Sequence, residues 1–471
     1  MAVSGTAEAS PVHVMNARGK VHVTDDPHVP AVDPADLRLR APKPRASTRA
    51  TAEPRTPRVL RTLLDTGQID QAAYDRALGD FKRANQLARK FSGARAAALR
   101  GVIADLEGMA ARGYVTRGRL PSLVATLEAN IRWWSTGSLL GSGARVSFTG
   151  SQIVWQHYPG HGLQIQWLAT WGKANGLFWA DNQDAALAQI VAESVSLAAD
   201  RAGGIAFEYL FPFDGGSPPW VSGLAQGTAL SALVRAGLRL HDSTWYQAAR
   251  NAVGIFRVAP PEGVAQKTAN GTHYLQYSFA PRLHILNGFV QSLNGLFDYA
   301  KVLNDPEGQQ LFAAGRAEAA AELPSYDTGG WSKYSEYRDS DLHYHDVLRG
   351  FLISLCTRLQ KAKQSDEPFC RYASRFTLDL KDPPVIHFDR SQAVARPRRT
   401  AHVKFSIDKP GTVTVAITRG KFSHRVSVSV ASGAHSFDWR PPTAGTYTIK
   451  ISATDLAGNS SSAGSAATVR R

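Results

Sequence analysis

Two segments in the middle of the chain are dense in side chains that can transfer protons. The first, HYLQYSFAPR (273–282), contains Gln276, Tyr277 and Arg282. A tyrosine hydroxyl beside an arginine can give or take a proton, because the cation stabilises the phenolate. A single ring of this kind more often fills a gap between helices, so only the cluster suggests a site. The second segment, YDTGGWSKYSEYRDSDLHYHD (326–346), holds the further candidates Tyr334, Tyr337, Arg338, Tyr344 and His345.

The chemistry that suits such a set is proton transfer next to a carboxylate. The C5 hydrogen of a hexuronic acid is weakly acidic, and its removal moves charge onto the C6 carboxylate. A cation or a hydrogen-bond donor must stabilise that charge. An epimerase needs a proton-transfer group on each face of the sugar ring, whereas a lyase needs one base and then expels the C4 substituent. Neither reaction requires a metal or an organic cofactor, and the chain has no Walker, dinucleotide, HExxH or GxSxG motif.

Three regions follow from composition and hydrophobic period. The 471 residues, 43% hydrophobic and 20% charged, indicate a folded chain of two or three domains. Residues 1–56 are rich in Pro and Arg and predict a disordered leader. Residues 57–380 have the helical period and predict paired helices curled into an α/α barrel (toroid), with a short β-hairpin near 144–156. Long links between the helices would gather at one end and form the cleft.

After residue 380 the helical spacing of hydrophobic residues ends, and hydrophobic residues instead occupy every second position. Residues 384–471 therefore predict a small all-β, immunoglobulin-like sandwich. It resembles the modules appended to bacterial secreted proteins. The two cysteines of the chain, Cys356 and Cys370, either form one disulfide or are buried thiols.

The net charge of +15 is unevenly distributed. Residues 381–471 carry 14 basic and 5 acidic residues, whereas residues 141–380 carry 19 and 21. A nucleic-acid enzyme would concentrate the charge near its active region, so we expect no nucleic-acid partner. The basic C-terminal module instead suits an acidic polymer or a cell surface. No apolar run is long enough for a transmembrane helix.

Three segments, occurring in the same order along the chain, resemble the C-terminal helical domain of the D-glucuronyl C5-epimerases. They are PPWVSGLAQGTALSALVRAGL (218–238), YLQYSFAPRLHILNGFVQSLNGLFDY (274–299) and YDTGGWSKYSEYRDSDLHYH (326–345). The most specific parts are W-x-S-x-x-A-Q-G, L-N-G-F and Y-D-T-G. The resemblance implies a mainly helical enzyme that converts D-glucuronyl to L-iduronyl residues in a heparan-type polysaccharide.

The resemblance also implies site residues. Tyr277 and Tyr344 match functional tyrosines of the family and would be the opposing acid and base. Tyr334 would be the third catalytic tyrosine, and Arg338 would meet the substrate carboxylate. The other residues expected to contact substrate are Gln276, Arg282, His345, Tyr337, Tyr158, Asn287 and Trp220.

The chain departs from the family in two respects. Gln276 stands where the family has a carboxylate, and the family's large β-domain is absent. Three alternatives therefore remain: a polysaccharide lyase, a glycoside hydrolase using Asp327, Glu336 or Asp341, and a non-catalytic glycan-binding surface protein. We expect an anionic polysaccharide as substrate and an extracellular or cell-surface location, although no signal peptide is visible. A homodimer is also compatible with the sequence.

Overall fold

The computed structural model describes residues 10–41, 54–389 and 396–470, which divide into two compact units. Unit 1 comprises residues 1–282 and 291–316, and unit 2 comprises residues 283–290 and 317–471. The boundary falls within two helices, α9 (Leu286–Leu303) and α10 (Pro306–Glu322). Each unit is described by itself.

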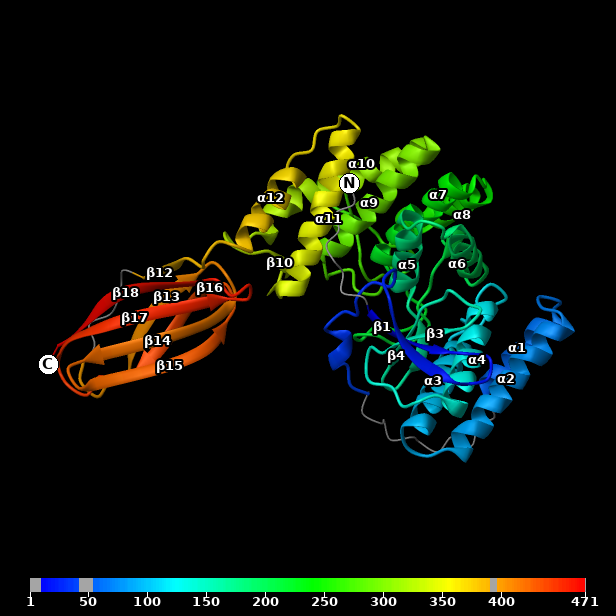
Figure 1. The fold of residues 1–471 in the computed structure, drawn as a ribbon, viewed down its shortest axis with the longest axis horizontal. Helices are drawn as coiled ribbons and strands as arrows, with labels where there is room; N and C mark the ends of the chain where they lie inside the picture. The colour runs from blue at the N-terminus through cyan, green and yellow to red at the C-terminus, as the bar shows by residue number, and fades with distance from the viewer. Residues whose placement is uncertain (1–9, 42–53, 390–395, 471) are drawn as a thin grey trace. The chain divides into compact units, whose positions relative to one another are not determined.

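Unit 1 contains a mixed sheet in the order β2-β1-β3-β4-β5. Its strands are β1 (Ser10–Met15), β2 (Val21–Asp26), β3 (Arg145–Phe148), β4 (Trp155–Tyr158) and β5 (Gly162–Ile165). The hairpin expected near 144–156 is confirmed, since β3 and β4 pair antiparallel with Val146 opposite Trp155. Strand β1 pairs parallel with β3, so the two lie side by side (Figure 1).

That sheet corrects the expectation of a disordered leader. Residues Ser10–Asp26 form an antiparallel strand pair, and Val12 packs in a core with Val29, Val154 and Ala169. The short alternation VHVM is compatible with an extended piece, but its pairing could not be read from the sequence because its partner strand, β3, begins at Arg145, far along the chain. The Pro/Arg-rich linker at 42–53 lies outside the described residues.

The helices of unit 1 follow their sequence signals closely. Asp70 caps the helix Gln71–Lys90 by accepting a hydrogen bond from the Ala73 amide at 2.8 Å. Residues Gly162–Ile165 pair with β4 as a strand although they lie within the region of helical period, so the next helix begins only at Trp167. The helices are α1 (Arg55–Asp65), α2 (Gln71–Lys90), α3 (Gly93–Ala111), α4 (Leu120–Thr136), α5 (Trp167–Trp179), α6 (Asp184–Ser196), α7 (Gly223–Leu240) and α8 (Thr244–Ala252).

Helix α7 is the buried centre of unit 1. Fourteen of its eighteen residues are buried, and Ser222 caps its start. It contacts α9 closely, since a Cβ on Gly295 would lie 2.0 Å from the Gly227 carbonyl oxygen. Short hairpins flank it: β6 (Ala199–Arg201) with β7 (Gly204–Ala206), and β8 (Ala265–Lys267) with β9 (Thr272–Tyr274).

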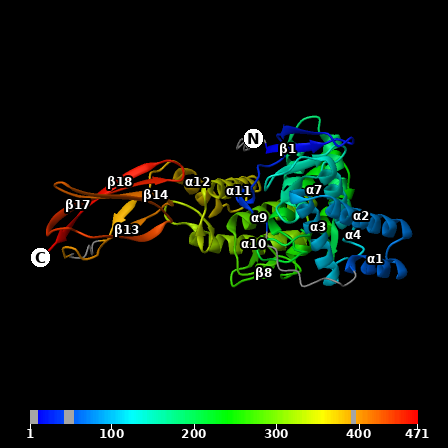
Figure 2. The same cartoon turned by 90° about the horizontal axis from the view of Figure 1, so that it is seen from below.

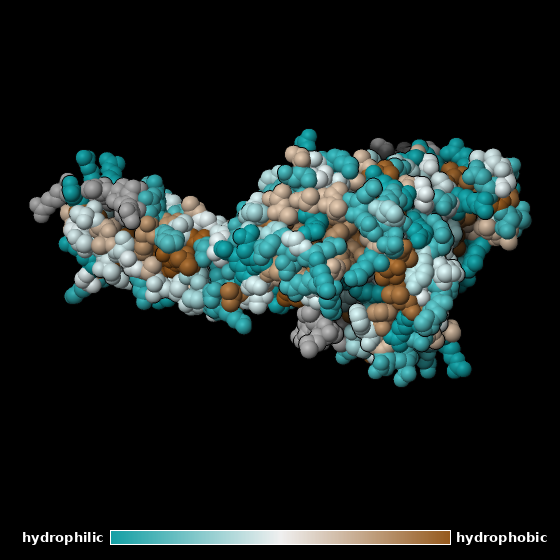
Figure 3. Space-filling model, turned by 90° about the horizontal axis from the view of Figure 1, so that it is seen from above, coloured by the Kyte–Doolittle hydropathy of each residue, from teal (hydrophilic) through white to brown (hydrophobic). Residues whose placement is uncertain are grey.

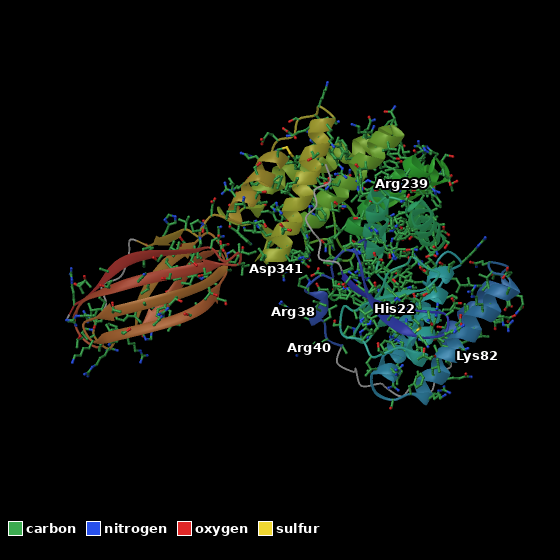
Figure 4. The ribbon with its side chains drawn as sticks, viewed as in Figure 1. His22, Arg38, Arg40, Lys82, Arg239 and Asp341 are labelled. Carbon is green, nitrogen blue, oxygen red and sulfur yellow. A yellow bond between two sulfur atoms is a disulfide. The ribbon has the colours of Figure 1, made fainter. Side chains whose placement is uncertain are left out.

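In unit 2, a turn and a hairpin lie between the end of α10 and the last two helices. The hairpin pairs β10 (Lys333–Ser335) with β11 (Arg338–Asp339), and helices α11 (Leu342–Lys361) and α12 (Phe369–Asp379) follow. Cys356 on α11 and Cys370 on α12 form a disulfide. Figure 4 marks Asp341 at the start of α11.

The C-terminal part of unit 2 is a pair of antiparallel sheets on one core. One sheet has the order β12-β13-β16 and the other β15-β14-β17-β18. Alternate residues such as Val403, Val415 and Ile451 are buried between them, and Figure 2 shows β13 and β14 in separate layers. The strands are β12 (Ile386–Phe388), β13 (Ala401–Ile407), β14 (Gly411–Arg419), β15 (Phe422–Val430), β16 (Gly433–Trp439), β17 (Gly445–Asp455) and β18 (Ser460–Val469).

The predicted fold class is confirmed at this coarse level: a helical part followed by a region of sheets. The α/α toroid and the immunoglobulin-like topology remain predictions. Among the described residues, no helix combines the length and apolar character that a membrane span needs. On the face shown in Figure 3, hydrophobic residues occur in small groups among hydrophilic ones.

Candidate functional site

In unit 2, a turn, a hairpin and a helix start position two of the predicted tyrosines. The Asp327 carboxylate accepts the Gly329 amide at 2.8 Å and pairs with Arg375 at 2.7 Å, which holds the YDTG turn. Tyr334 follows on β10. The Asp341 carboxylate caps α11 by accepting the Tyr344 amide at 2.9 Å. These local contacts fix the backbone at both tyrosines.

The structure brings Tyr334, Tyr344 and Arg338 together. The two tyrosine ring centroids are 4.4 Å apart, and the Arg338 guanidinium carbon lies 4.6 Å from the Tyr334 centroid. The His343 ring lies 5.4 Å from that of Tyr344. The Arg338 cation stabilises negative charge that develops on Tyr334, the phenol whose ring contacts that of Tyr344. The group can therefore support proton transfer.

His345, the residue after Tyr344, is completely buried. Its ring stacks on Trp331 at 3.9 Å, its Nδ1 accepts the Ser332 amide at 3.2 Å, and its Nε2 lies 2.9 Å from the Phe376 carbonyl oxygen. Burial lowers the pKa of His345 to about 4, so the ring stays neutral near pH 7. With both nitrogens engaged, its observed contacts are those of a packing residue.

The other predicted residues of unit 2 differ in exposure. Tyr337 is 81% exposed on the hairpin, whereas Asn287 is buried in the first turn of α9, where its side-chain oxygen accepts the Gly288 amide. Glu336 lies 3.3 Å from His284, whose pKa is raised mainly by a hydrogen bond to Glu322. Because Asp327 holds a turn and Asp341 caps a helix, these carboxylates already have structural partners.

In unit 1, aromatic rings surround Tyr277. Its ring lies 5.7 Å from Trp220, 5.8 Å from Phe213 and 5.4 Å from Phe279. Its hydroxyl accepts the Gln276 amide at 2.9 Å, while the buried Gln276 Oε1 has no partner among the described residues. Glutamine thus takes the place beside the tyrosine where the resembled family has a carboxylate.

Tyr158 belongs to a second buried group in unit 1, together with Tyr209. Gln166 bridges the two: its Nε2 donates to Tyr158 Oη at 2.9 Å, and its Oε1 accepts from Tyr209 Oη at 3.0 Å. Trp220 stacks on Tyr209 with centroids 4.2 Å apart. Burial raises the pKa values of Tyr158 and Tyr209, so both remain protonated donors. Arg282 is exposed.

Sequence reasoning missed two members of this group, Tyr209 and Arg145. Arg145 lies opposite Gln156 on the face of β3 and β4 that also carries Tyr158. The signal was present in the alternation of RVSF, WQHY and GLQI, where every second residue is polar or small. Tyr277 belongs to unit 1 and Tyr344 to unit 2, so their convergence on one sugar ring stays a prediction.

Comparison with known proteins identifies the segment that holds most of these residues. Residues 200–377 match the family model described as "D-glucuronyl C5-epimerase C-terminus". This segment is related to the D-glucuronyl C5-epimerases. A D-glucuronyl C5-epimerase of Caenorhabditis elegans is 32% identical over 130 residues, which are 25% of this chain and 21% of the nematode protein.

Two further similarities are more distant. An uncharacterized protein of Methanocaldococcus jannaschii is 24% identical over 176 residues, 36% of this chain and 56% of that protein. The chain therefore spans about a fifth of the nematode epimerase and about half of the archaeal protein. An endo-beta-1,4-glucanase structure from Acetobacter xylinum aligns with a TM-score of 0.27 and 15% identity, over 35% of this chain and 51% of that one.

Proposed function

We propose that this chain is a uronate C5-epimerase-like enzyme that acts on a hexuronic-acid-containing polysaccharide, of the D-glucuronyl to L-iduronyl type. The supporting observation is the family match, because residues 200–377 include Tyr277, Tyr334 and Tyr344. The proposal therefore rests on a related segment that carries each of the predicted catalytic tyrosines.

In the proposed reaction, one tyrosine removes the C5 proton and the other supplies a proton to the opposite face. Tyr277 and Tyr344 take these two roles. The electron pair left at C5 delocalises into the C6 carboxylate as an enolate-like charge, which needs cations or donors nearby. Tyr334, whose ring contacts that of Tyr344, and Arg338, which lies over the ring of Tyr334, would supply them. His345 and Asn287 act as positioning residues, and Gln276, Trp220, Tyr337, Tyr158 and Arg282 contribute substrate contacts.

The test is C5 exchange in deuterated water. Purified protein is incubated with a glucuronate polysaccharide, and NMR follows deuterium entering C5 without chain cleavage. We expect Tyr277→Phe and Tyr344→Phe each to lower the exchange rate by about a hundredfold or more, as for loss of a general acid or base. Tyr74→Phe, a buried tyrosine of α2 outside both groups, is the matched control and should exchange like the wild type.

Two results would contradict the proposal. Absence of exchange with every uronan tried would remove the epimerase assignment. A new ultraviolet absorbance from a C4–C5 double bond would show lyase chemistry instead, since the two reactions share only the first step.

Location and further partners belong to the same proposal. We place the protein outside the cell or at its surface, where an anionic polysaccharide is available. The basic residues of the C-terminal segment, 14 against 5 acidic residues over 381–471, suit attachment to an acidic polymer or surface. Salt-sensitive retention of the wild type on an anionic polysaccharide column would support this attachment, and salt-insensitive elution would contradict it.

A further inference from the structure

One face of the β3–β4–β5 sheet in unit 1 is both polar and buried. Successive side chains of a strand point to opposite faces, so Arg145 on β3 and Gln156 and Tyr158 on β4 share a face. Gln164 on β5, opposite Gln156, extends it. The other face carries Val146, Phe148, Trp155, Leu163 and Ile165. A row of buried polar side chains must find hydrogen-bond partners or pay a desolvation penalty.

Several polar atoms on this face have no partner among the described residues. They are Nε and Nη1 of Arg145, Oγ of Ser147 and Oε1 of Gln156. Arg145 is only 4% exposed, and no carboxylate of the described chain lies within ion-pair distance of it. The nearby Asp36 carboxylate instead accepts the Gln156 amide at 2.7 Å. A buried guanidinium without an ion-pair partner is costly, so the presence of Arg145 here calls for an explanation.

Tyr158 adds a further donor beside Arg145. Its oxygen already accepts the Gln166 amide, and no described residue accepts its hydrogen. Because burial raises the pKa of Tyr158, this hydrogen stays on the phenol near pH 7. The face therefore presents unused donors from Arg145 and Tyr158 and one unused acceptor, the Gln156 Oε1.

We propose that Arg145 binds the carboxylate of a uronate residue of the substrate, with Tyr158 donating to the same group and Gln156 accepting from a sugar hydroxyl. A guanidinium matches a carboxylate because it offers two parallel N–H donors. A carboxylate flanked by hydroxyls is the ligand that uses this combination of donors and acceptor. The inference rests on the proposed function for its substrate class, and it names a second arginine, remote in sequence from Arg338.

The test replaces each of two buried arginines with methionine and compares the effects on melting temperature. The effect of the Arg145 substitution on ligand binding is then measured. Arg145→Met removes a charge that has no protein partner, so the melting temperature should stay equal or rise. Arg201→Met is the matched control, because Arg201 is also buried but donates to Glu208 at 2.6 Å. Its loss should lower the melting temperature by several degrees.

Binding is measured by calorimetry with a glucuronate hexasaccharide and with the same hexasaccharide after reduction of its carboxylates. We expect Arg145→Met to bind the acidic hexasaccharide about ten- to hundredfold more weakly, as for loss of a charged hydrogen-bond pair. The reduced hexasaccharide should bind both proteins equally. Arg145→Lys, which keeps the charge but not the parallel donors, should recover part of the affinity.

The outcomes separate this inference from the proposed function. Unchanged affinity in Arg145→Met, or a stability loss equal to that of Arg201→Met, overturns the inference whatever the protein catalyses. Failure of the wild type to bind the acidic hexasaccharide overturns it as well. Carboxylate-dependent binding through Arg145 without C5 exchange would support the site and reject the epimerase.

Discussion

The surroundings of His345 decide what this residue can do. Its Nδ1 accepts a backbone amide, and its Nε2 faces a backbone carbonyl, so the neutral ring with a proton on Nε2 satisfies both. A second proton on Nδ1 would break the first of these bonds. The sequence analysis placed His345 among the residues that contact substrate; the ring of the preceding residue, Tyr344, is the one that lies beside Tyr334.

His345 gives a pH prediction. The pKa of His345 is about 4 in the folded state and about 6.5 in the unfolded state. Between these values the unfolded chain binds more protons, so stability is full above pH 6.5 and falls as the pH drops towards 4, by up to about 3 kcal/mol. Urea unfolding at pH 7 and pH 5 should show this loss, and His345→Gln should show less of it.

A control at another histidine makes the result specific. His22 lies exposed on β2 (Figure 4), and His22→Gln should follow the wild-type dependence on pH. An unchanged dependence in His345→Gln would assign the acid sensitivity to other groups and would contradict the role given to this ring.

At the level of elements, buried ion pairs join segments of unit 1 that are distant in sequence. Glu208 accepts from Arg119, which precedes α4, at 2.6 and 3.0 Å, and from Arg201 on β6 at 2.6 Å. The Glu208 side chain is 2% exposed. Removing one member of such a group leaves the others charged and unpaired, which is more destabilising than the intact group is stabilising.

We therefore expect Glu208→Gln to lower the free energy of unfolding by about 3 kcal/mol or more. Glu128→Gln is the matched control, because the Arg76–Glu128 pair is exposed and should contribute at most about 1 kcal/mol. Denaturant unfolding of the two variants measures the difference. Equal losses would mean that the burial of Glu208 carries no extra energetic weight.

Local signals explain which elements were predictable. The Asp70 cap, the alternation around Val146 and Trp155, and the period of two in the C-terminal strands all lie within a few residues of the structure that they specify. Strand β1 and the shared face of β3 and β4 depend on partners distant in the sequence. For the same reason Arg145 was missed, since only the folded sheet shows that its guanidinium has no partner.

At the scale of the whole chain, the N-terminal strands are an integral part of unit 1. Val12 is 1% exposed, in the core with Val29, Val154 and Ala169. We expect Val12→Asp to lower the stability by about 3 kcal/mol or more, because it buries an unpaired charge. Val23→Asp on β2, where the side chain is 57% exposed, is the control. Thermal unfolding that is the same for both variants would show that the strand pair is detachable.

The parallel pairing of β1 with β3 has a consequence for biosynthesis. Val12 stands opposite Arg145 in the register, so strand β1 meets this neighbour only after more than a hundred further residues have been translated. Until then its edge is open to other nascent chains. A holdase chaperone that shields this segment during synthesis would therefore raise the yield of the folded protein, while one that binds only completed chains would not.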